Sequence, residues 1–121
     1  MSAPPSRDRF LVEEMNRHLS VIAELAKAGR ESLETNLPQL YALEHACELL
    51  AEAAKHTSRE FRTINPEISW DSIRRLRTAV AHPYDQGASR VRLERLWGFA
   101  VKDGPLLTRQ LGRARYDHRK A

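Results

Sequence analysis

Apolar residues recur at steps of three and four through most of this chain, and that period constrains the fold more than any other feature. Between Asp8 and Ala28 the recurring positions are Phe10, Leu11, Met15, Leu19, Ile22, Leu25 and Ala26. Such spacing places one apolar stripe along a helix, with charged residues on its other face. Ser6 is a suitable N-cap and Gly29 a suitable C-terminal stop. A first helix is therefore predicted over residues 8–28.

A second, longer helix is predicted from Asn36 to Phe61. Asn36 can cap it, and Pro38 falls in the first turn, where its missing N–H does no harm. Small residues are frequent on its apolar stripe and allow helices to approach closely. The stripe consists of Leu40, Leu43, Cys47, Leu50, Ala51 and Ala54.

Two further helices are predicted in the second half of the chain. Ser69 can cap a helix over residues 70–81, with Ile73, Leu76 and Val80 on its stripe, which Pro83 prevents from continuing. Another begins near Ser89, and Gly104-Pro105 should kink or break it. Its apolar positions are Val91, Leu93, Leu96, Trp97, Ala100, Val101, Leu106, Leu107 and Leu111. The predicted fold is all-α, an up-and-down bundle of four main helices with a short C-terminal helical extension.

Length and composition limit the chain to one modest domain. It has 121 residues, of which 41% are hydrophobic and 30% charged, with a net charge of +4 that permits a nucleic-acid partner. We expect a flexible N-terminus over residues 1–7, the helical domain over 8–112 and a mobile basic tail over 113–121. No apolar run is long enough to span a membrane, and the single cysteine excludes an internal disulfide. A cytoplasmic protein without a membrane partner is expected.

Several kinds of catalytic site are excluded by what the sequence lacks. The five glycines form no phosphate-binding Gly-rich loop, and no histidine follows a glutamate at the Glu-x-x-His spacing of di-iron bundles. Cys47 lies on an apolar stripe and is interpreted as a small core residue. No metal site and no cofactor are predicted.

Glu44, Glu48 and Glu52 lie on one edge of the second predicted helix. Like charges at this spacing repel by about 0.2–0.5 kcal/mol per pair when exposed. We therefore expect basic side chains from elsewhere in the bundle to face them.

Arg77, His82 and Tyr84 form the densest group of chemically capable residues, at the end of the third predicted helix. Because Pro83 ends that helix, the His82 imidazole can swing back toward the Arg77 guanidinium. Arginine grips phosphate oxygens bidentately, and histidine exchanges protons near neutral pH. Together they suit metal-free RNA cleavage. The spacing also allows a structural interpretation, in which Arg77 pairs with Glu48 or Glu52 and His82 only interacts with the helix dipole.

A longer pattern around these residues resembles the HEPN superfamily, and within it the HepT-like ribonuclease toxins of HEPN/MNT toxin–antitoxin pairs. The resemblance rests on Pro66-Glu67-Ile68-Ser69-Trp70, followed by Ile73, Leu76, Arg77, His82 and Tyr84. Upstream it includes Glu48-Leu49-Leu50-Ala51-Glu52 and Glu60-Phe61-Arg62, and downstream Leu96-Trp97 and Lys102-Asp103-Gly104-Pro105. It extends over roughly residues 8–111.

The resemblance implies a homodimer in which two Arg-x-x-x-x-His-x-Tyr segments meet in an RNA-cleaving cleft without metal. By position, Arg77 and His82 are then the catalytic pair. Tyr84 matches the tyrosine that a partner MNT-type nucleotidyltransferase antitoxin modifies with AMP, which places bulky negative charge beside the site. Other residues expected to take part are Thr78, Glu48 and Glu52 as supporting polar groups and Arg74 and Arg75 as RNA contacts.

This sequence departs from the pattern of the family at several positions. Thr78 follows the arginine, where the family often has a strongly polar residue such as Asn, and Pro83 follows the histidine, where it commonly has Gly. The Arg-Asn pair on the Glu-rich helix of the family is here His45 and Ala46. The departures bear on cleavage strength more than on fold. The alternative interpretation is a catalytically weak HEPN module that binds RNA or a nucleotidyltransferase.

Overall fold

A computed structural model of the chain describes residues 5–81 and 88–116, and all regular structure in those ranges is helical. None of the described helices is both long enough and apolar enough to cross a membrane. The elements are α1 (Pro5–Lys27), α2 (Arg30–Thr35), α3 (Leu37–Lys55), α4 (Arg59–Ile64), α5 (Trp70–Ala81), α6 (Ala88–Gly98), the π-helical turn η1 (Phe99–Asp103) and α7 (Gly104–Leu111).

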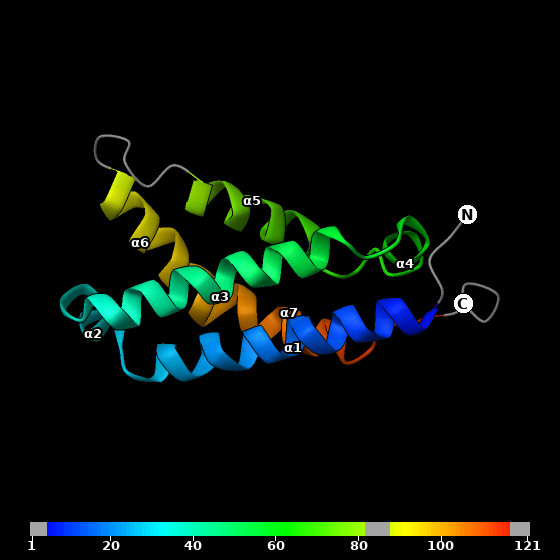
Figure 1. Cartoon of the computed structure of the whole chain (residues 1–121), viewed down its shortest axis with the longest axis horizontal. Helices are drawn as coiled ribbons and strands as arrows, with labels where there is room; N and C mark the ends of the chain where they lie inside the picture. Colours follow the sequence, from blue (N-terminus) through cyan, green and yellow to red (C-terminus); the bar gives the residue numbers. More distant parts are fainter. Residues whose placement is uncertain (1–4, 82–87, 117–121) are drawn as a thin grey trace.

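The long helices run alternately up and down, as predicted. Figure 1 shows α1 and α3 side by side in opposite directions, with α5 returning along α3. The last arm consists of α6, η1 and α7, and it packs against α5 at one end and against α1 at the other. The four predicted helical arms are therefore present, and the all-α bundle is confirmed.

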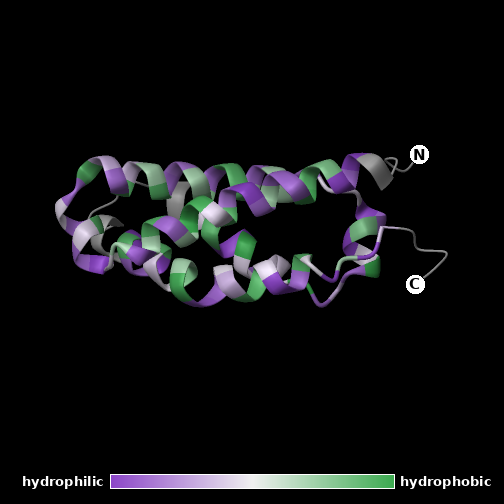
Figure 2. Ribbon diagram, turned by 90° about the horizontal axis from the view of Figure 1, so that it is seen from below, coloured by the Kyte–Doolittle hydropathy of each residue, from purple (hydrophilic) through white to green (hydrophobic). Residues whose placement is uncertain are grey.

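The core lies between α1, α3, α5 and the last arm. Hydrophobic and hydrophilic residues alternate along the ribbons of Figure 2, as expected for helices with one buried face. Met15, Leu43, Cys47, Leu50 and Leu96 have no exposed surface. Cys47 is thus a core residue, as its place on the stripe predicted.

Three apolar residues predicted to be buried are exposed instead. Phe10, Val101 and Leu106 have exposed fractions of 58%, 47% and 40%. The buried face of α1 is centred on Val12, and two residues along a helix correspond to about 200° of rotation, which turns Phe10 outward. Leu106 is one residue, or about 100°, from the buried Leu107.

The single helix predicted over residues 36–61 is wrong after Lys55. The chain breaks at residues 56–58 and restarts as α4. Ser58 caps α4 by accepting from Phe61 N at 3.0 Å, and Asp8 of α1 accepts from both the amide and the hydroxyl of Ser58. Because this cap depends on a residue far away in sequence, the local period did not reveal the break.

Two other predicted helix boundaries are confirmed, whereas Ser6, predicted as the N-cap of the first helix, lies inside α1, which begins at Pro5. The Asn36 side chain accepts from Gln39 N at 3.1 Å at the start of α3. Gly29 has φ of +90°, a conformation that side-chain-bearing residues rarely adopt, and it separates α1 from the short helix α2, which the period did not predict.

The kink predicted at Gly104-Pro105 takes the form of the π-helical turn η1. Pro105 has no N–H to donate, and the Gly104 amide reaches back to the Phe99 carbonyl, which widens the turn. A Cβ on Gly104 would lie 3.3 Å from that carbonyl oxygen and 3.8 Å from Leu19 Cδ2. The contact with Leu19 is an ordinary one, whereas the contact with the Phe99 carbonyl is tight, and this carbonyl explains why glycine stands here.

Candidate functional site

Helix α5 carries the predicted site and is fixed at its start. Ile73 and Leu76 are buried on its inner face. The Trp70 indole donates to the Asn65 carbonyl at 3.0 Å, and the Ser69 amide donates to Gln110 Oε1 at 2.8 Å. These bonds tie the first turn of α5 to the preceding loop and to α7. The outer face of the helix is left to solvent.

Arg77 lies on that outer face, toward α3. Its side chain is exposed, and no described carboxylate lies within ion-pair distance of it. A hydrogen bond from His56, together with the nearby charges of Lys55 and Arg77, lowers the pKa of Glu52. Arg77 therefore acts on Glu52 through space but keeps its guanidinium available, which differs from the direct pairing that the spacing also allowed.

The two glutamates predicted as supporting groups each pair with a nearby histidine, Glu48 with one on α3 and Glu52 with the residue that caps the end of α3. Glu52 Oε1 and His56 Nε2 are 3.0 Å apart, and Glu48 Oε2 and His45 Nδ1 are 3.7 Å apart. All four side chains are largely exposed. Glu52 is thus brought near Arg77, whereas the described contact of Glu48 is with His45.

The remaining predicted residues on α5 have local partners. The Thr78 hydroxyl donates weakly to the Arg74 carbonyl at 3.4 Å. Arg74 forms an exposed ion pair with Asp71, and Arg75 donates to the Ser72 hydroxyl at 3.4 Å. Arg74 is therefore partly neutralised, while Arg75 faces the opposite flank of the helix from Arg77.

His82 and Tyr84 lie outside the described residues, as does Pro83. The convergence of His82 with Arg77 and the role of Tyr84 therefore remain predictions.

An ion pair joins α3 and α6. The sequence predicted that a basic side chain would face the glutamates of α3, but it did not show which one. Glu44 Oε2 lies 3.2 Å from Arg92 Nη1, and their side chains are 17% and 13% exposed. A basic partner for the glutamate edge is thus confirmed at Glu44. Burial raises the pKa of Glu44 against the opposing effect of Arg92, and among the described residues its Oε1 has no hydrogen-bond partner.

A second contact fixes α6 to α2. The Arg30 guanidinium binds both Glu94 oxygens and also donates to Glu34 Oε1 at 3.0 Å. The hydrogen bonds from Glu94 and Glu34 hold the pKa of Arg30 above its ordinary value. No pattern in the sequence predicts this contact, because it depends on how α2 and α6 meet in space.

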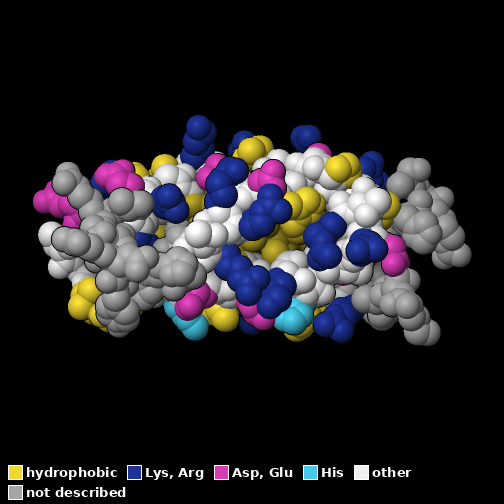
Figure 3. Space-filling view, turned by 90° about the horizontal axis from the view of Figure 1, so that it is seen from above, with side chains coloured by type: hydrophobic (Ala, Val, Ile, Leu, Met, Phe, Trp, Pro, Cys, Tyr) yellow, Lys and Arg dark blue, Asp and Glu magenta, His cyan; other side chains and the backbone are white. Residues whose placement is uncertain are grey.

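A groove lies between α5 and the α6–η1 arm, with a volume of about 650 Å³. Its cationic lining residues are Arg75, Arg95 and Lys102, and Leu76 and Phe99 lie at its base. On the α5 side of the molecule, Figure 3 shows Lys and Arg side chains gathered around apolar atoms. We refer to this feature as the cationic groove.

The rest of the groove lining is small or polar. Ser72 and Thr78 contribute hydroxyls, and Gly98 leaves open space where a side chain would stand. Among the described lining residues, Asp103 supplies the single carboxylate. The groove therefore combines net positive charge with hydrogen-bonding groups and a small apolar base.

Neither a metal-binding cluster nor a reactive thiol is present in the described part of the chain. It holds no group of His, Cys, Asp or Glu side chains arranged to bind a metal ion. Burial raises the pKa of the Cys47 thiol to about 12, so that its nucleophilic thiolate form is scarce at neutral pH.

Residues 15–114 match the family described as Ribonuclease HepT-like, which is most of the chain. The chain belongs to the HepT-like family. A protein named probable ribonuclease HepT, from Thermococcus cleftensis, is 33% identical over 67 residues, which are 55% of this chain and 57% of that protein. The chain thus spans little more than half the length of this relative. No solved structure matches this chain.

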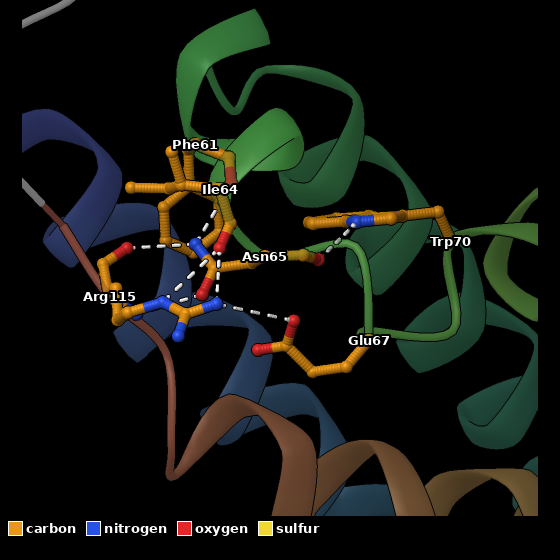
Figure 4. A network of polar contacts seen from close by, with 6 residues as sticks. All are labelled: Phe61, Ile64, Asn65, Glu67, Trp70 and Arg115. Carbon is orange, nitrogen blue, oxygen red and sulfur yellow. Dashed lines mark hydrogen bonds and ion pairs between the residues drawn. The ribbon is translucent and has the colours of Figure 1, made fainter. Parts of the chain in front are cut away.

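The HepT-like match ends at residue 114, just before Arg115, which a polar network joins to the matched region (Figure 4). The buried Asn65 amide donates to the Phe61 and Arg115 carbonyls at 2.8 Å each, and its Oδ1 accepts from the Arg115 amide at 2.8 Å. The Arg115 side chain donates to the Ile64 carbonyl and lies 3.7 Å from a Glu67 oxygen. One asparagine thereby joins the end of α4 to the chain after α7.

Aromatic contacts reinforce this join. The Tyr116 ring lies 5.4 Å from that of Phe61, and Arg9 of α1 sits 4.2 Å above it. Within the basic tail predicted over residues 113–121, Arg115 and Tyr116 thus lie against α4 and α1, and residues 117–121 are outside the described part.

Proposed function

We propose that this HepT-like protein is an endoribonuclease toxin of the HEPN type, which cleaves RNA with Arg77 and His82 and without a metal ion. Two observations support the proposal. The chain belongs to a family described by ribonuclease activity, and Arg77 is exposed on a helix that also borders the cationic groove. The first observation carries the proposal.

The chemistry follows from the two side chains. The neutral His82 imidazole takes the proton of an RNA 2′-hydroxyl, and the 2′-oxygen attacks the adjacent phosphorus. The bond from phosphorus to the 5′-oxygen breaks, and that oxygen takes a proton from an imidazolium. The products are a 2′,3′-cyclic phosphate and a 5′-hydroxyl. Arg77 binds the non-bridging oxygens, where negative charge accumulates in the transition state.

The proposal includes a homodimer in which two copies of this segment form one cleft, and control by a partner MNT nucleotidyltransferase. The partner transfers AMP from ATP to the Tyr84 hydroxyl, with release of pyrophosphate. An added phosphodiester and adenosine would repel the RNA backbone and fill the space beside His82.

Cleavage of a labelled RNA by purified protein in EDTA tests the catalytic part. Wild type should release fragments that end in a 2′,3′-cyclic phosphate, and Arg77→Ala and His82→Ala should each lose most of this activity. Arg77→Lys should cleave RNA more slowly than wild type, because an ammonium ion cannot bind two phosphate oxygens in the bidentate geometry of a guanidinium. Arg17→Gln, on α1, is the matched control and should cleave normally. Unchanged cleavage by both the Ala variants would refute the assignment.

Mass spectrometry tests the modification. After incubation with the partner and ATP, wild type should gain mass in multiples of AMP and lose RNA cleavage. Tyr84→Phe should gain none. A gain that persists in Tyr84→Phe would exclude Tyr84 as the acceptor. Sedimentation of the unmodified protein should give the mass of two chains, and a monomer that cleaves RNA would overturn the shared cleft.

A further inference from the structure

We infer that the cationic groove between α5 and the α6–η1 arm binds one nucleotide of single-stranded RNA at a distance from the cleaved bond. This inference rests on the proposed ribonuclease function, since it assigns part of the substrate to a second place on the same molecule. Arg75, Arg95 and Lys102 contact phosphates, and the base lies over Leu76 and Phe99.

Charge is the first argument for a polyanionic ligand. In the part of the lining that the structure describes, the groove places three cations around one carboxylate, Asp103. Within the described residues, none of the three is in an ion pair, whereas the neighbouring Arg74 is paired with Asp71. Clustered cations that outnumber the carboxylates around them raise the local concentration of an anionic ligand and release bound counterions when they contact phosphates.

Shape and chemistry favour a nucleotide over a bare anion. A volume of about 650 Å³ lies within the usual range of ligand sites, which is about 300–1,000 Å³. An apolar base beside cations suits a nucleobase attached to its phosphate, because bases have flat apolar faces. The hydroxyls of Ser72 and Thr78 and the Asp103 carboxylate can meet the polar edge of a base or the sugar hydroxyls.

The groove and Arg77 lie on opposite flanks of α5. Arg75 lines the groove toward α6, whereas Arg77 faces Glu52 of α3. A helix with its side chains is about 10 Å across. An RNA strand that reaches both must cross the outer face of α5, so the nucleotide in the groove differs from the one at the cleavage site. The groove therefore contributes to affinity and to the choice of RNA, and not to bond cleavage.

Gly98 allows the groove to be filled without altering any charge. It is helical, with φ −57° and ψ −42°, and a Cβ built on it meets no atom within 4 Å. Gly98→Leu should therefore fold and occupy part of the groove. Gly98→Ala adds a single carbon and serves as its matched control.

The probe is a fluorescein-labelled 2′-O-methyl RNA oligonucleotide of mixed sequence, which lacks the hydroxyl needed for cleavage. Fluorescence anisotropy over a series of KCl concentrations gives its affinity for each variant. We expect Gly98→Leu to bind about tenfold more weakly than wild type, within the range for loss of one stacked base. Gly98→Ala should bind within about twofold of wild type.

Charge variants test the phosphate contacts. The double variant Arg95→Gln/Lys102→Gln should lower the slope of log K against log salt by about 1.4, or 0.7 for each contact to a single strand. Arg17→Gln removes one cation from α1, where it is paired with Glu14 at 3.5 Å, and should leave the slope unchanged. Circular dichroism confirms that each variant is folded.

Several outcomes would overturn the inference. Wild-type affinity in both Gly98→Leu and the double charge variant would exclude the groove from RNA binding. Displacement of the probe by polyglutamate as effectively as by unlabelled oligonucleotide would point to an acidic protein as the ligand. Failure of the proposed function would give a different result. RNA cleavage would then be absent or independent of Arg77, while the groove variants would still bind the probe more weakly than wild type. With a cleavable RNA, Gly98→Leu should raise KM and leave kcat nearly unchanged.

Discussion

Glu44 of α3 and Arg92 of α6 form a largely buried ion pair, with 3.2 Å between Oε2 and Nη1. Arg92→Met removes the counter-charge and leaves a carboxylate in a poorly solvated position. We expect the free energy of unfolding to fall by about 1–3 kcal/mol, somewhat less than for a fully buried pair. Urea unfolding followed by circular dichroism measures the change.

The matched control for Arg92→Met is Glu44→Leu/Arg92→Met, which replaces both charges with apolar groups. Because no charge is then left without a partner, the double variant should lose less stability than Arg92→Met alone. A double variant that is less stable than the single one would show that the pair stabilises the fold through its own attraction.

The raised pKa of Glu44 predicts a particular dependence of stability on pH. Burial favours the neutral carboxyl in the folded state, so the folded protein binds this proton more tightly than the unfolded chain. The contribution of Glu44 to stability should therefore decline as pH rises above the ordinary value of 4.5 through the raised folded pKa. The unfolding free energy of wild type minus that of Glu44→Gln, measured from pH 4 upward, should fall with rising pH. A rise of this quantity with pH would contradict burial as the cause of the raised pKa of Glu44.

Local patterns predicted the parts of the fold that depend on neighbouring residues. The Asn36 cap, the stop at Gly29 and most of the buried positions of α3 followed from short-range spacing, although Leu40 is only partly buried. The break before α4 was missed because Ser58 is held by Asp8 across the bundle.

The candidate site likewise has one part that the sequence predicted and one part that it did not. Arg77 was identified from its spacing and from a resemblance, and the structure leaves it exposed on α5. The cationic groove could not be predicted, because Arg75 and Lys102 become neighbours only when α5 packs beside η1. Sequence reasoning can place a side chain on a helix face, but it cannot determine which other helix that face will meet.

Asn65 should be among the residues most sensitive to substitution. Asn65→Asp removes the two donated hydrogen bonds and points carboxylate oxygens at the Phe61 and Arg115 carbonyls. We expect a loss of about 2–4 kcal/mol, since buried polar groups are left unpaired. Tryptophan fluorescence during urea unfolding reports the loss.

A variant of the partner residue separates the asparagine bonds from the ion pair. Arg115→Ala removes the exposed guanidinium but keeps the backbone groups that Asn65 contacts, and it should cost less than about 1 kcal/mol. Equal losses for Asn65→Asp and Arg115→Ala would assign the effect to the side chain of Arg115.

Two glycines of the last arm should respond to alanine in opposite directions. Gly98 has open space around its Cβ position, so Gly98→Ala should stabilise the helix by about 0.5–1 kcal/mol. At Gly104 the added carbon meets the Phe99 carbonyl at 3.3 Å, and that oxygen is fixed by the Gly104 amide itself. Gly104→Ala should therefore lower the melting temperature while Gly98→Ala raises it. A rise in both would mean that the π-helical turn relaxes without cost.

Cys47 should be unreactive until the bundle opens. It has no exposed surface, and burial raises its pKa from 9.0 to about 12. At pH 8 the thiolate fraction is then lower by about three orders of magnitude than for an exposed cysteine. The native protein should react with 5,5′-dithiobis(2-nitrobenzoate) far more slowly than the protein in urea, and Arg92→Met should react faster than wild type because its bundle opens more often. Rapid reaction of the native wild type would place Cys47 outside a stable core and contradict its complete burial.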